Sequence, residues 1–314
     1  MEGGIFLFPS FVSPFTFPPQ KLGLQKDPRP VLNLALSSLI LHTVLTRFER
    51  GFTRQGTHFN CLPLSAAGLP SVGTLNPVKR RFLSAAAEAI IPALLLAALI
   101  ILHPVSIDLA VERFFAPDGT FPLQNSAALL FFHKWAKLLT VFVALGVIAI
   151  AVKDRAKISP RISVTEAGYL ITAILVCVGT VSVLKDMTGV YCPVSTTFFG
   201  GTHPILAPHF GFSLSAPGNC WPGGFAGTGF SLIPFWFAFR RRRPTLARAG
   251  LFFAILFGTV CGVIQMMRGY HFPSHNVATF LLDWSLSALV YLAFLASSLK
   301  RSHAARFIRI PQKA

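Results

Sequence analysis

The sequence is poor in charged residues and in cysteine, and both shortages narrow the class of protein. Only 12% of its 314 residues are charged, whereas 53% are hydrophobic and the mean hydropathy is +0.61. This composition excludes an ordinary soluble domain and predicts a chain that crosses a membrane several times. Five cysteines are too few for a disulfide scaffold, and the sequence has no Cys/His spacing typical of a metal site.

Acidic residues are the scarcest charged type, so the chain has a formal net charge of +17. Nucleic-acid binding is not expected, because the sequence has no basic stripe with interleaved aromatic residues. The basic residues instead form groups between apolar runs, at 79–81, 153–161, 240–248 and 300–313. In a six-span arrangement these groups all fall on one side, which the positive-inside rule identifies as cytoplasmic. The connections 103–127, 186–224 and 268–275 then face outward.

The predicted membrane domain covers residues 76–300 and contains six apolar runs, at 85–102, 127–152, 166–184, 225–239, 250–267 and 277–299. We therefore predict an all-α integral membrane protein, a six-transmembrane helical bundle with outward-facing loops. Residues 1–75 show little periodicity and are expected to form a poorly structured or interfacial N-terminal extension. No basic segment precedes the first apolar run, which argues against a cleavable signal peptide. Residues 301–314 are expected to form a basic cytoplasmic tail.

The most unusual stretch, Gln-Met-Met-Arg-Gly-Tyr-His-Phe-Pro-Ser-His, covers residues 265–275 and separates two apolar runs. Gln265 and Arg268 share one helix face at i, i+3, and Gly269 frees the backbone to turn. An arginine and two histidines at a membrane edge are costly and indicate a functional site, here one suited to a phosphate. The alternative is a snorkelling arginine beside an interfacial histidine.

Two further stretches, residues 185–193 and 220–229, lie on the same outward side. The first places Lys185 at a helix end, and the second is a glycine-rich turn that leads into a helix N-terminus. Such a turn exposes backbone N–H groups, and the helix dipole there favours an anion. Taken alone, Lys185 can also be interpreted as an anchor at the membrane interface, and the glycines can also be interpreted as allowing close helix packing.

These two stretches resemble the first two motifs of the type 2 phosphatidic acid phosphatases, a family of six-span membrane enzymes. The family's first motif reads Lys-x6-Arg-Pro; here Lys185 and Pro193 fit, and Cys192 stands where arginine is usual. Its second motif reads Pro-Ser-Gly-His; here Gly223 replaces the serine and Phe225 replaces the histidine.

The opening stretch resembles the family's third motif, which reads Ser-Arg-x5-His-x3-Asp. Here His271 fits, Gln265 stands in place of the arginine and His275 in place of the aspartate. A bacterial branch of the family is more similar, with Lys-x6-Cys-Pro, then Cys-Phe-Pro-Ala-Gly-His-Ala-Ser, then Gln-x2-Arg-Gly-Ala-His-Phe-Leu-Ser-His. The residues that conform to this branch are Cys192, Gln265, Arg268, Gly269, His271, Phe272, Ser274 and His275. The resemblance covers about residues 85–299.

The resemblance implies that His271 attacks phosphorus to form a phosphohistidine, which water then hydrolyses, and that His275 orients its imidazole. It also implies a set of groups that hold the phosphoryl oxygens: Lys185, Arg268, Gln265 and the backbone N–H groups near Gly223, Gly224 and Phe225. It implies no metal and no other cofactor. Phe225 stands at the position of the acid that protonates the leaving oxygen, and losing such an acid costs about 10²–10⁴-fold in rate.

Three consequences of Phe225 stay open. The protein is a weak or silent relative, or it acts on a leaving group that needs no proton, or another histidine of the outer loop, His203 or His209, supplies the acid. Cys192 and Cys220 also admit two interpretations in this outward, oxidising setting: a disulfide that joins two motif loops, or two small buried residues.

Together these features predict a bacterial inner-membrane protein whose active face is periplasmic. Its substrate is expected to be a lipid phosphate or pyrophosphate of the bilayer. The alternative is a catalytically silent relative that binds anionic lipid or a partner. A transporter is disfavoured, because the charges lie at the membrane edge and the sequence has no visible repeat. The acids Glu88 and Asp283, inside predicted spans, either pair with arginine or hydrogen-bond to a neighbouring helix.

Overall fold

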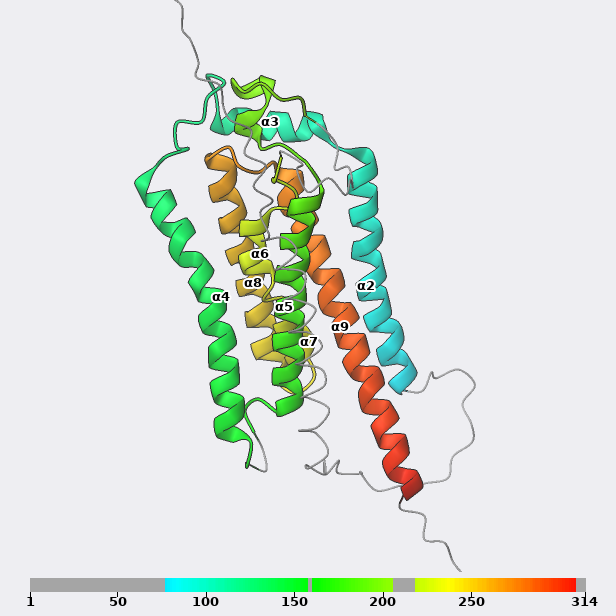
Figure 1. Ribbon diagram of the computed structural model, residues 1–314. Helices are drawn as coiled ribbons and strands as arrows, with labels where there is room; N and C mark the ends of the chain where they lie inside the picture. The colour runs from blue at the N-terminus through cyan, green and yellow to red at the C-terminus, as the bar shows by residue number, and fades with distance from the viewer. Residues whose placement is uncertain (1–76, 158–159, 206–217, 309–314) are drawn as a thin grey trace, which may run out of the picture.

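The computed structural model describes residues 77–157, 160–205 and 218–308 of the chain (Figure 1). The predicted N-terminal extension, residues 1–75, lies outside the described residues, as do residues 309–314 of the predicted tail. Residues 301–308 of that tail continue the last helix.

The described chain is helical. Its five long helices are α2 (Pro77–Leu102), α4 (Ala127–Asp154), α5 (Val164–Met187), α8 (Pro244–Met267) and α9 (Pro273–Ile308). Its shorter helices are α3 (Val105–Phe115), η1 (Pro193–Ser195), η2 (Thr197–Phe199), α6 (Gly224–Phe230) and α7 (Pro234–Phe239). The long helices lie side by side as a bundle, and α3 lies across one end of it (Figure 1).

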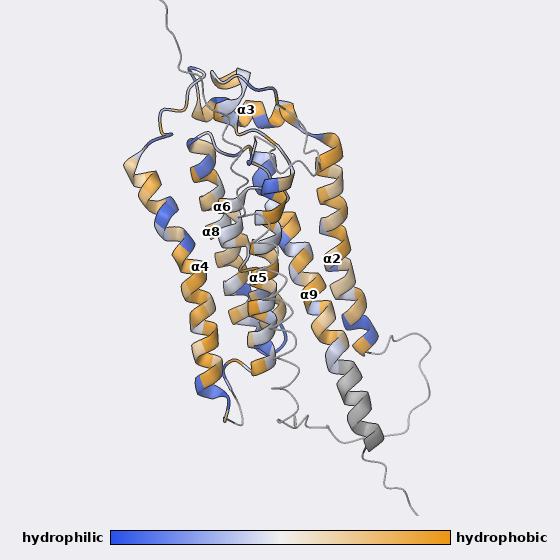
Figure 2. Cartoon of the chain, in the orientation of Figure 1, coloured by the Kyte–Doolittle hydropathy of each residue, from blue (hydrophilic) through white to orange (hydrophobic). Residues whose placement is uncertain are grey.

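The five long helices are long and apolar enough to cross a membrane. Figure 2 shows hydrophobic residues along the middle of these helices and hydrophilic residues mostly near their ends. Many of the hydrophobic side chains point away from the protein: Ile101 is 81% exposed, Phe252 69% and Phe131 65%. Lipid tails satisfy such a surface, whereas water does not, so the chain is an integral membrane protein.

The fourth predicted span, residues 225–239, is not one continuous helix. It consists of α6 and α7, which are separated at Ser231–Ile233. Pro234 lacks a backbone N–H and starts α7, so the helical hydrogen bonds are interrupted there. This broken segment is buried in the bundle, where Gly229 packs so closely on Gly258 of α8 that a Cβ would lie 2.1 Å from the Gly258 nitrogen. Five helices of the described chain are long and apolar enough to cross a membrane, so the six-span arrangement stays a prediction.

Ion pairs gather at the end of the bundle opposite to α3. Arg240 Nη1 lies 2.6 Å from a carboxylate oxygen of Glu88, which identifies the arginine partner of that acid. Asp154 pairs with Lys157 and Arg161 close by. Asp283 differs, because both of its carboxylate oxygens are buried without a hydrogen-bond partner among the described residues.

Candidate functional site

The three outward stretches of the sequence meet at the end of the bundle that α3 covers. α5 ends at Met187, α8 ends at Met267 and α9 begins at Pro273, so the residues beyond these helix ends adjoin one another. A cavity of about 220 Å³ lies between them, lined by His133, Lys185, Cys192, Asn219, Cys220, Gln265, Arg268, Tyr270 and His271. Among the described residues, two cationic side chains and no carboxylate face this cavity, so its charge suits an anion.

A sharp turn after α8 aims the third stretch into the cavity. Gly269 has φ of +73°, and a Cβ on it would lie 2.4 Å from the Phe121 ring, so a side chain is excluded on both counts. The Tyr270 N–H donates to the Gln265 carbonyl oxygen at 2.8 Å, and the Val194 N–H donates to the Gly269 carbonyl oxygen at 3.0 Å. These bonds fix the turn against the loop that follows α5.

The Arg268 guanidinium is buried and held from three sides. Its Nε donates to the Gln124 carbonyl oxygen at 3.1 Å, and its Nη1 donates to Gln265 Oε1 at 3.0 Å. The Tyr270 ring packs on the guanidinium, with 4.7 Å from Cζ to the ring centroid. These contacts fix the direction of the cation and leave Nη2 without a hydrogen-bond partner among the described residues.

Lys185 lies in the last turn of α5 and extends over the start of α6. A Cβ on Gly224 would lie 3.0 Å from Lys185 Cδ and 3.4 Å from its Nζ, so the lysine occupies the space that a larger residue would need. The lysine has no ion-pair partner among the described residues, and its ammonium group remains available to an anion.

His271 is 3% exposed and lines the cavity. Burial of the ring, followed by the nearby positive charge of Lys185, lowers the pKa of His271 well below its usual value of 6.5. The imidazole is therefore neutral at pH 7 and has a lone pair on one ring nitrogen.

The cavity brings together Lys185, Arg268 and His271, three of the residues on which the predicted phosphate site rests. The family model of the PAP2 superfamily matches residues 166–298. Over these residues the chain is similar to the PAP2 superfamily. This confirms the family predicted from the motifs, while the bacterial branch stays a prediction. No curated protein and no solved structure was found to match the chain.

The match to the PAP2 superfamily indicates a membrane protein of phosphatase type. The matched residues include Lys185, Arg268 and His271, and the cavity joins these three side chains. The matched residues do not include α4, which contributes His133 to the same cavity.

His275, which the resemblance assigns to orienting the His271 imidazole, lies in the first turn of α9. Its ring centroid lies 5.9 Å from that of His271, and the two rings make no hydrogen bond in the described structure. His275 packs on Phe272 instead and does not line the cavity. The chain enters α9 at Pro273, two residues after His271.

The expectation that the Gly223 N–H holds a phosphoryl oxygen is corrected by the structure. That N–H donates to the His275 carbonyl oxygen at 3.1 Å, so it is already engaged. A Cβ on Gly223 would also lie 2.6 Å from the Asn276 side-chain oxygen. Neither Gly223 nor Gly224 lines the cavity, and both serve the close packing of α6 on its neighbours.

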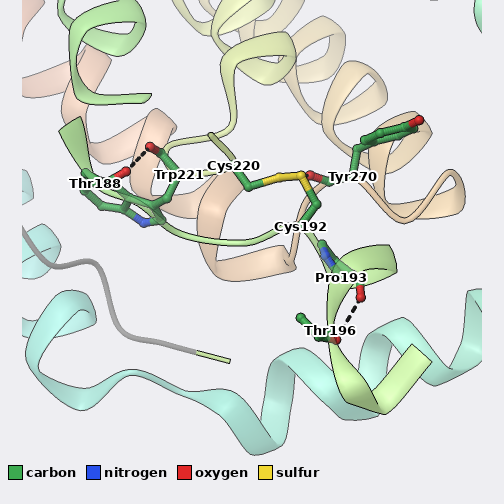
Figure 3. The surroundings of a disulfide bond; sticks show 7 residues. All are labelled: Thr188, Cys192, Pro193, Thr196, Cys220, Trp221 and Tyr270. Atoms are coloured by element: carbon green, nitrogen blue, oxygen red, sulfur yellow. Dashed lines mark hydrogen bonds between the residues drawn. A yellow bond between two sulfur atoms is a disulfide. The ribbon is translucent and has the colours of Figure 1, made fainter. Parts of the chain in front are cut away.

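A disulfide joins Cys192 to Cys220, with a Cα–Cα distance of 5.2 Å (Figure 3). It connects the loop after α5 to the loop before α6, and both of its cysteines line the cavity. Close by, the Thr188 hydroxyl donates to the Trp221 carbonyl oxygen at 2.7 Å (Figure 3). The bridge and this hydrogen bond hold the first two motif loops together.

The position of the missing PAP2 acid is apolar. Phe225 is buried in a cluster with Ala136, Cys261 and Ile264, and it does not line the cavity. His203, one of the two candidates to replace the acid, stacks on Tyr191 at a centroid distance of 3.9 Å and also lies outside the cavity lining. The other candidate, His209, lies outside the described residues.

His133 lines the cavity although no sequence motif singled it out. It stands in the second turn of α4, between Phe132 and Lys134, in a helix whose residues are mostly apolar. The available signal was an imidazole inside a hydrophobic run, which is a functional candidate by default.

Proposed function

We propose that the protein hydrolyses a lipid phosphate or pyrophosphate at the extracytoplasmic leaflet, through a phosphohistidine on His271. The observation that carries this proposal is the cavity in which Lys185, Arg268 and His271 meet, with no carboxylate among its described lining residues. Two fixed cations beside a neutral nucleophile form an arrangement suited to phosphoryl transfer, in which positioning and charge stabilisation supply most of the catalysis.

The proposed reaction has two steps. In the first, the lone pair of a His271 ring nitrogen forms a bond to phosphorus, and the bond from phosphorus to the leaving oxygen breaks. The leaving group departs with that electron pair, while Lys185 and Arg268 stabilise the negative charge on the phosphoryl oxygens. In the second step, a water oxygen attacks the phosphohistidine, the P–N bond breaks and the nitrogen regains its lone pair. Inorganic phosphate is released, and the water proton passes to solvent.

The leaving group sets the substrate class in this proposal. Phe225 cannot give a proton to the leaving oxygen, and the described part of the cavity has no carboxylic acid to replace it. A leaving group that is stable as an anion, such as the phosphate of a pyrophosphate, departs without a proton. An alkoxide from a simple phosphate monoester does not, so pyrophosphates are the preferred substrates.

The proposed orientation follows from charge. The basic groups at 79–81, 153–161 and 240–248 adjoin the ends of the long helices opposite to α3. By the positive-inside rule that end is cytoplasmic, so the cavity faces the periplasm of a bacterial inner membrane. In the six-span topology, α6 and α7 together form the fourth span.

A catalytically silent relative that binds anionic lipid is the second candidate. The apolar surroundings of Phe225 and the absence of a hydrogen bond between His271 and His275 favour it. In both cases a group that would assist catalysis is missing, whereas Lys185 and Arg268, the two cations that would bind an anion, are present.

Phosphate release by purified protein distinguishes the two candidates. The substrates are a polyprenyl pyrophosphate, a lipid A phosphate and phosphatidic acid in detergent micelles, and the variant is His271→Ala. His203→Ala is the matched control, because that histidine lies outside the cavity lining. Hydrolysis by the wild type and by His203→Ala, with loss in His271→Ala, supports the enzyme. Binding of these lipids by wild type without any phosphate release supports the silent relative.

A further inference from the structure

We propose that His133 is a catalytic residue of this site, whose Nε2–H donates a hydrogen bond to a phosphoryl oxygen. The inference rests on the proposed function and adds a residue from α4, a helix outside the matched residues 166–298. Hydrogen bonds within the site hold the imidazole in the tautomer that this role needs.

His133 has the position that such a donor requires. It lines the same cavity as Lys185, Arg268 and His271. Its ring packs on the Phe225 ring, with 4.3 Å between the centroids. An imidazole thus reaches the cavity from beside position 225, although it comes from a different helix.

The tautomer of His133 follows from a chain of hydrogen bonds that begins at Arg268. A guanidinium only donates hydrogen bonds, so the Gln265 side-chain atom that faces Arg268 Nη1 at 3.0 Å is the carbonyl oxygen Oε1. The amide nitrogen of Gln265 then points the other way, and it lies 2.8 Å from His133 Nδ1. An amide nitrogen only donates, so His133 Nδ1 accepts and carries no proton. The ring proton is therefore on Nε2.

The Nε2–H of His133 makes no hydrogen bond within the described residues, and the ring faces the cavity. A phosphate oxygen in the cavity is its natural acceptor, because hydrogen bonds to charged groups are stronger than those between neutral groups. No proton is transferred: Nε2 keeps its hydrogen throughout, and the bond shortens as charge develops on the phosphoryl oxygens. His133 therefore does not replace the acid that is missing at Phe225.

The two amide isosteres of histidine separate the donor role from the packing role. His133→Asn places an amide group near the position of Nδ1, so it can still accept from Gln265 but has no donor at the position of Nε2. His133→Gln places an amide nitrogen near the position of Nε2 and keeps the donor. We expect His133→Asn to lower kcat/KM by about 10²-fold, as removal of one preorganised donor does, and His133→Gln to lower it by about tenfold or less.

Binding of inorganic phosphate gives a readout that does not need turnover. Loss of one hydrogen bond to a charged ligand is expected to raise the Kd of phosphate by about tenfold or more in His133→Asn, and by less in His133→Gln. The measurement is titration calorimetry on the full-length protein in detergent, beside phosphate release from a polyprenyl pyrophosphate. His203→Ala serves as the control with unchanged values.

The outcomes separate this inference from the proposed function. If the wild type releases phosphate and His133→Asn has the same kcat/KM and the same phosphate Kd, the role of His133 is overturned but the proposed function stands. Phosphate binding without turnover ends the proposed enzyme, and the phosphate Kd of the two variants then decides the role of His133. A wild type that neither binds nor releases phosphate overturns both. If His133→Asn does not fold, nitrogen-15 NMR of the wild type decides, because a proton on Nδ1 contradicts this chain of hydrogen bonds.

Discussion

The side chain of Lys185, at the end of α5, lies directly over Gly224, the first residue of α6. A Cβ at position 224 would lie 3.4 Å from Lys185 Nζ and only 3.0 Å from Lys185 Cδ, and the latter is closer than two such atoms ordinarily pack. Gly224, which the sequence suggested as a phosphate-binding residue, thus leaves the Lys185 side chain room to reach the cavity.

Gly224→Ala is expected to displace the Lys185 ammonium group by a few tenths of an ångström. A misplaced cation stabilises the transition state less well, so kcat/KM should fall by about tenfold. Steady-state kinetics of phosphate release measure this. The matched control is Gly146→Ala in α4, where an added Cβ meets nothing within 4 Å and activity should not change. Equal activity in the two variants would show that the Lys185 position does not depend on Gly224.

The leaving group should control the rate. Because Phe225 cannot protonate the leaving oxygen, substrates with acidic leaving groups should react about 10²-fold or more faster than alkyl monoesters. The measurement compares kcat for p-nitrophenyl phosphate, phenyl phosphate and an alkyl phosphate. Phe225→His is expected to reduce this dependence, since an imidazole at that position can donate a proton. Rates that are equal for all three substrates in the wild type would mean that another group supplies the acid.

Much of the fold follows from the sequence alone, because apolar length and basic loops constrain a membrane protein strongly. The five long helices occur where apolar runs were predicted, and the third motif leads into the cavity as expected. The predicted fourth span is divided into α6 and α7, and α6 packs closely on α8. A hydropathy pattern does not predict which helices contact each other, so this division was not expected.

The site was only partly predictable for the same physical reason. Motif spacing indicated which residues lie near one another, but hydrogen-bond partners depend on how the helices pack. The Gly223 N–H is engaged by the His275 carbonyl oxygen, and His133 enters the cavity from a helix with no motif. Both facts require the packing of α4, α6 and α9 around one cavity.

Glu112 in α3 makes the stability of the protein depend on pH. Its carboxyl group is 0% exposed, and neither oxygen has a hydrogen-bond partner among the described residues. Burial, followed by the negative charge of Asp108, raises the pKa of Glu112 from 4.5 to about 9. Between these values the folded chain holds a proton that the unfolded chain releases, so the contribution of Glu112 to stability is fully present below pH 4.5 and is lost as pH rises toward 9, by up to about 1.4 kcal/mol per unit.

Glu112→Gln removes this titration, because an amide stays neutral at every pH. Thermal unfolding between pH 5 and pH 9 should show a steeper decline of Tm in the wild type than in Glu112→Gln, with the variant more stable at pH 8. Parallel curves for the two proteins would mean that Glu112 is ionised in the folded state.

The Cys192–Cys220 disulfide should stabilise both the fold and the cavity. It closes a loop with a sequence separation of 28 residues, and the chain-entropy model assigns about 3.6 kcal/mol to a loop of that size. The double variant Cys192→Ser/Cys220→Ser should unfold at a lower temperature, and reductant should lower the Tm of the wild type toward that of the variant. Reductant should not change the variant further. An unchanged wild-type Tm after mass spectrometry has shown reduction would contradict this.

The most direct test of the account is a search for the phosphohistidine itself. Purified protein is mixed with a polyprenyl pyrophosphate that carries ³²P in its terminal phosphate, and the reaction is stopped within milliseconds in alkaline detergent. We predict ³²P on the wild-type protein, alkali-stable and acid-labile, and none on His271→Ala. Phosphate release by the wild type without any labelled protein, or equal labelling of His271→Ala, would contradict the assignment of His271 as the nucleophile.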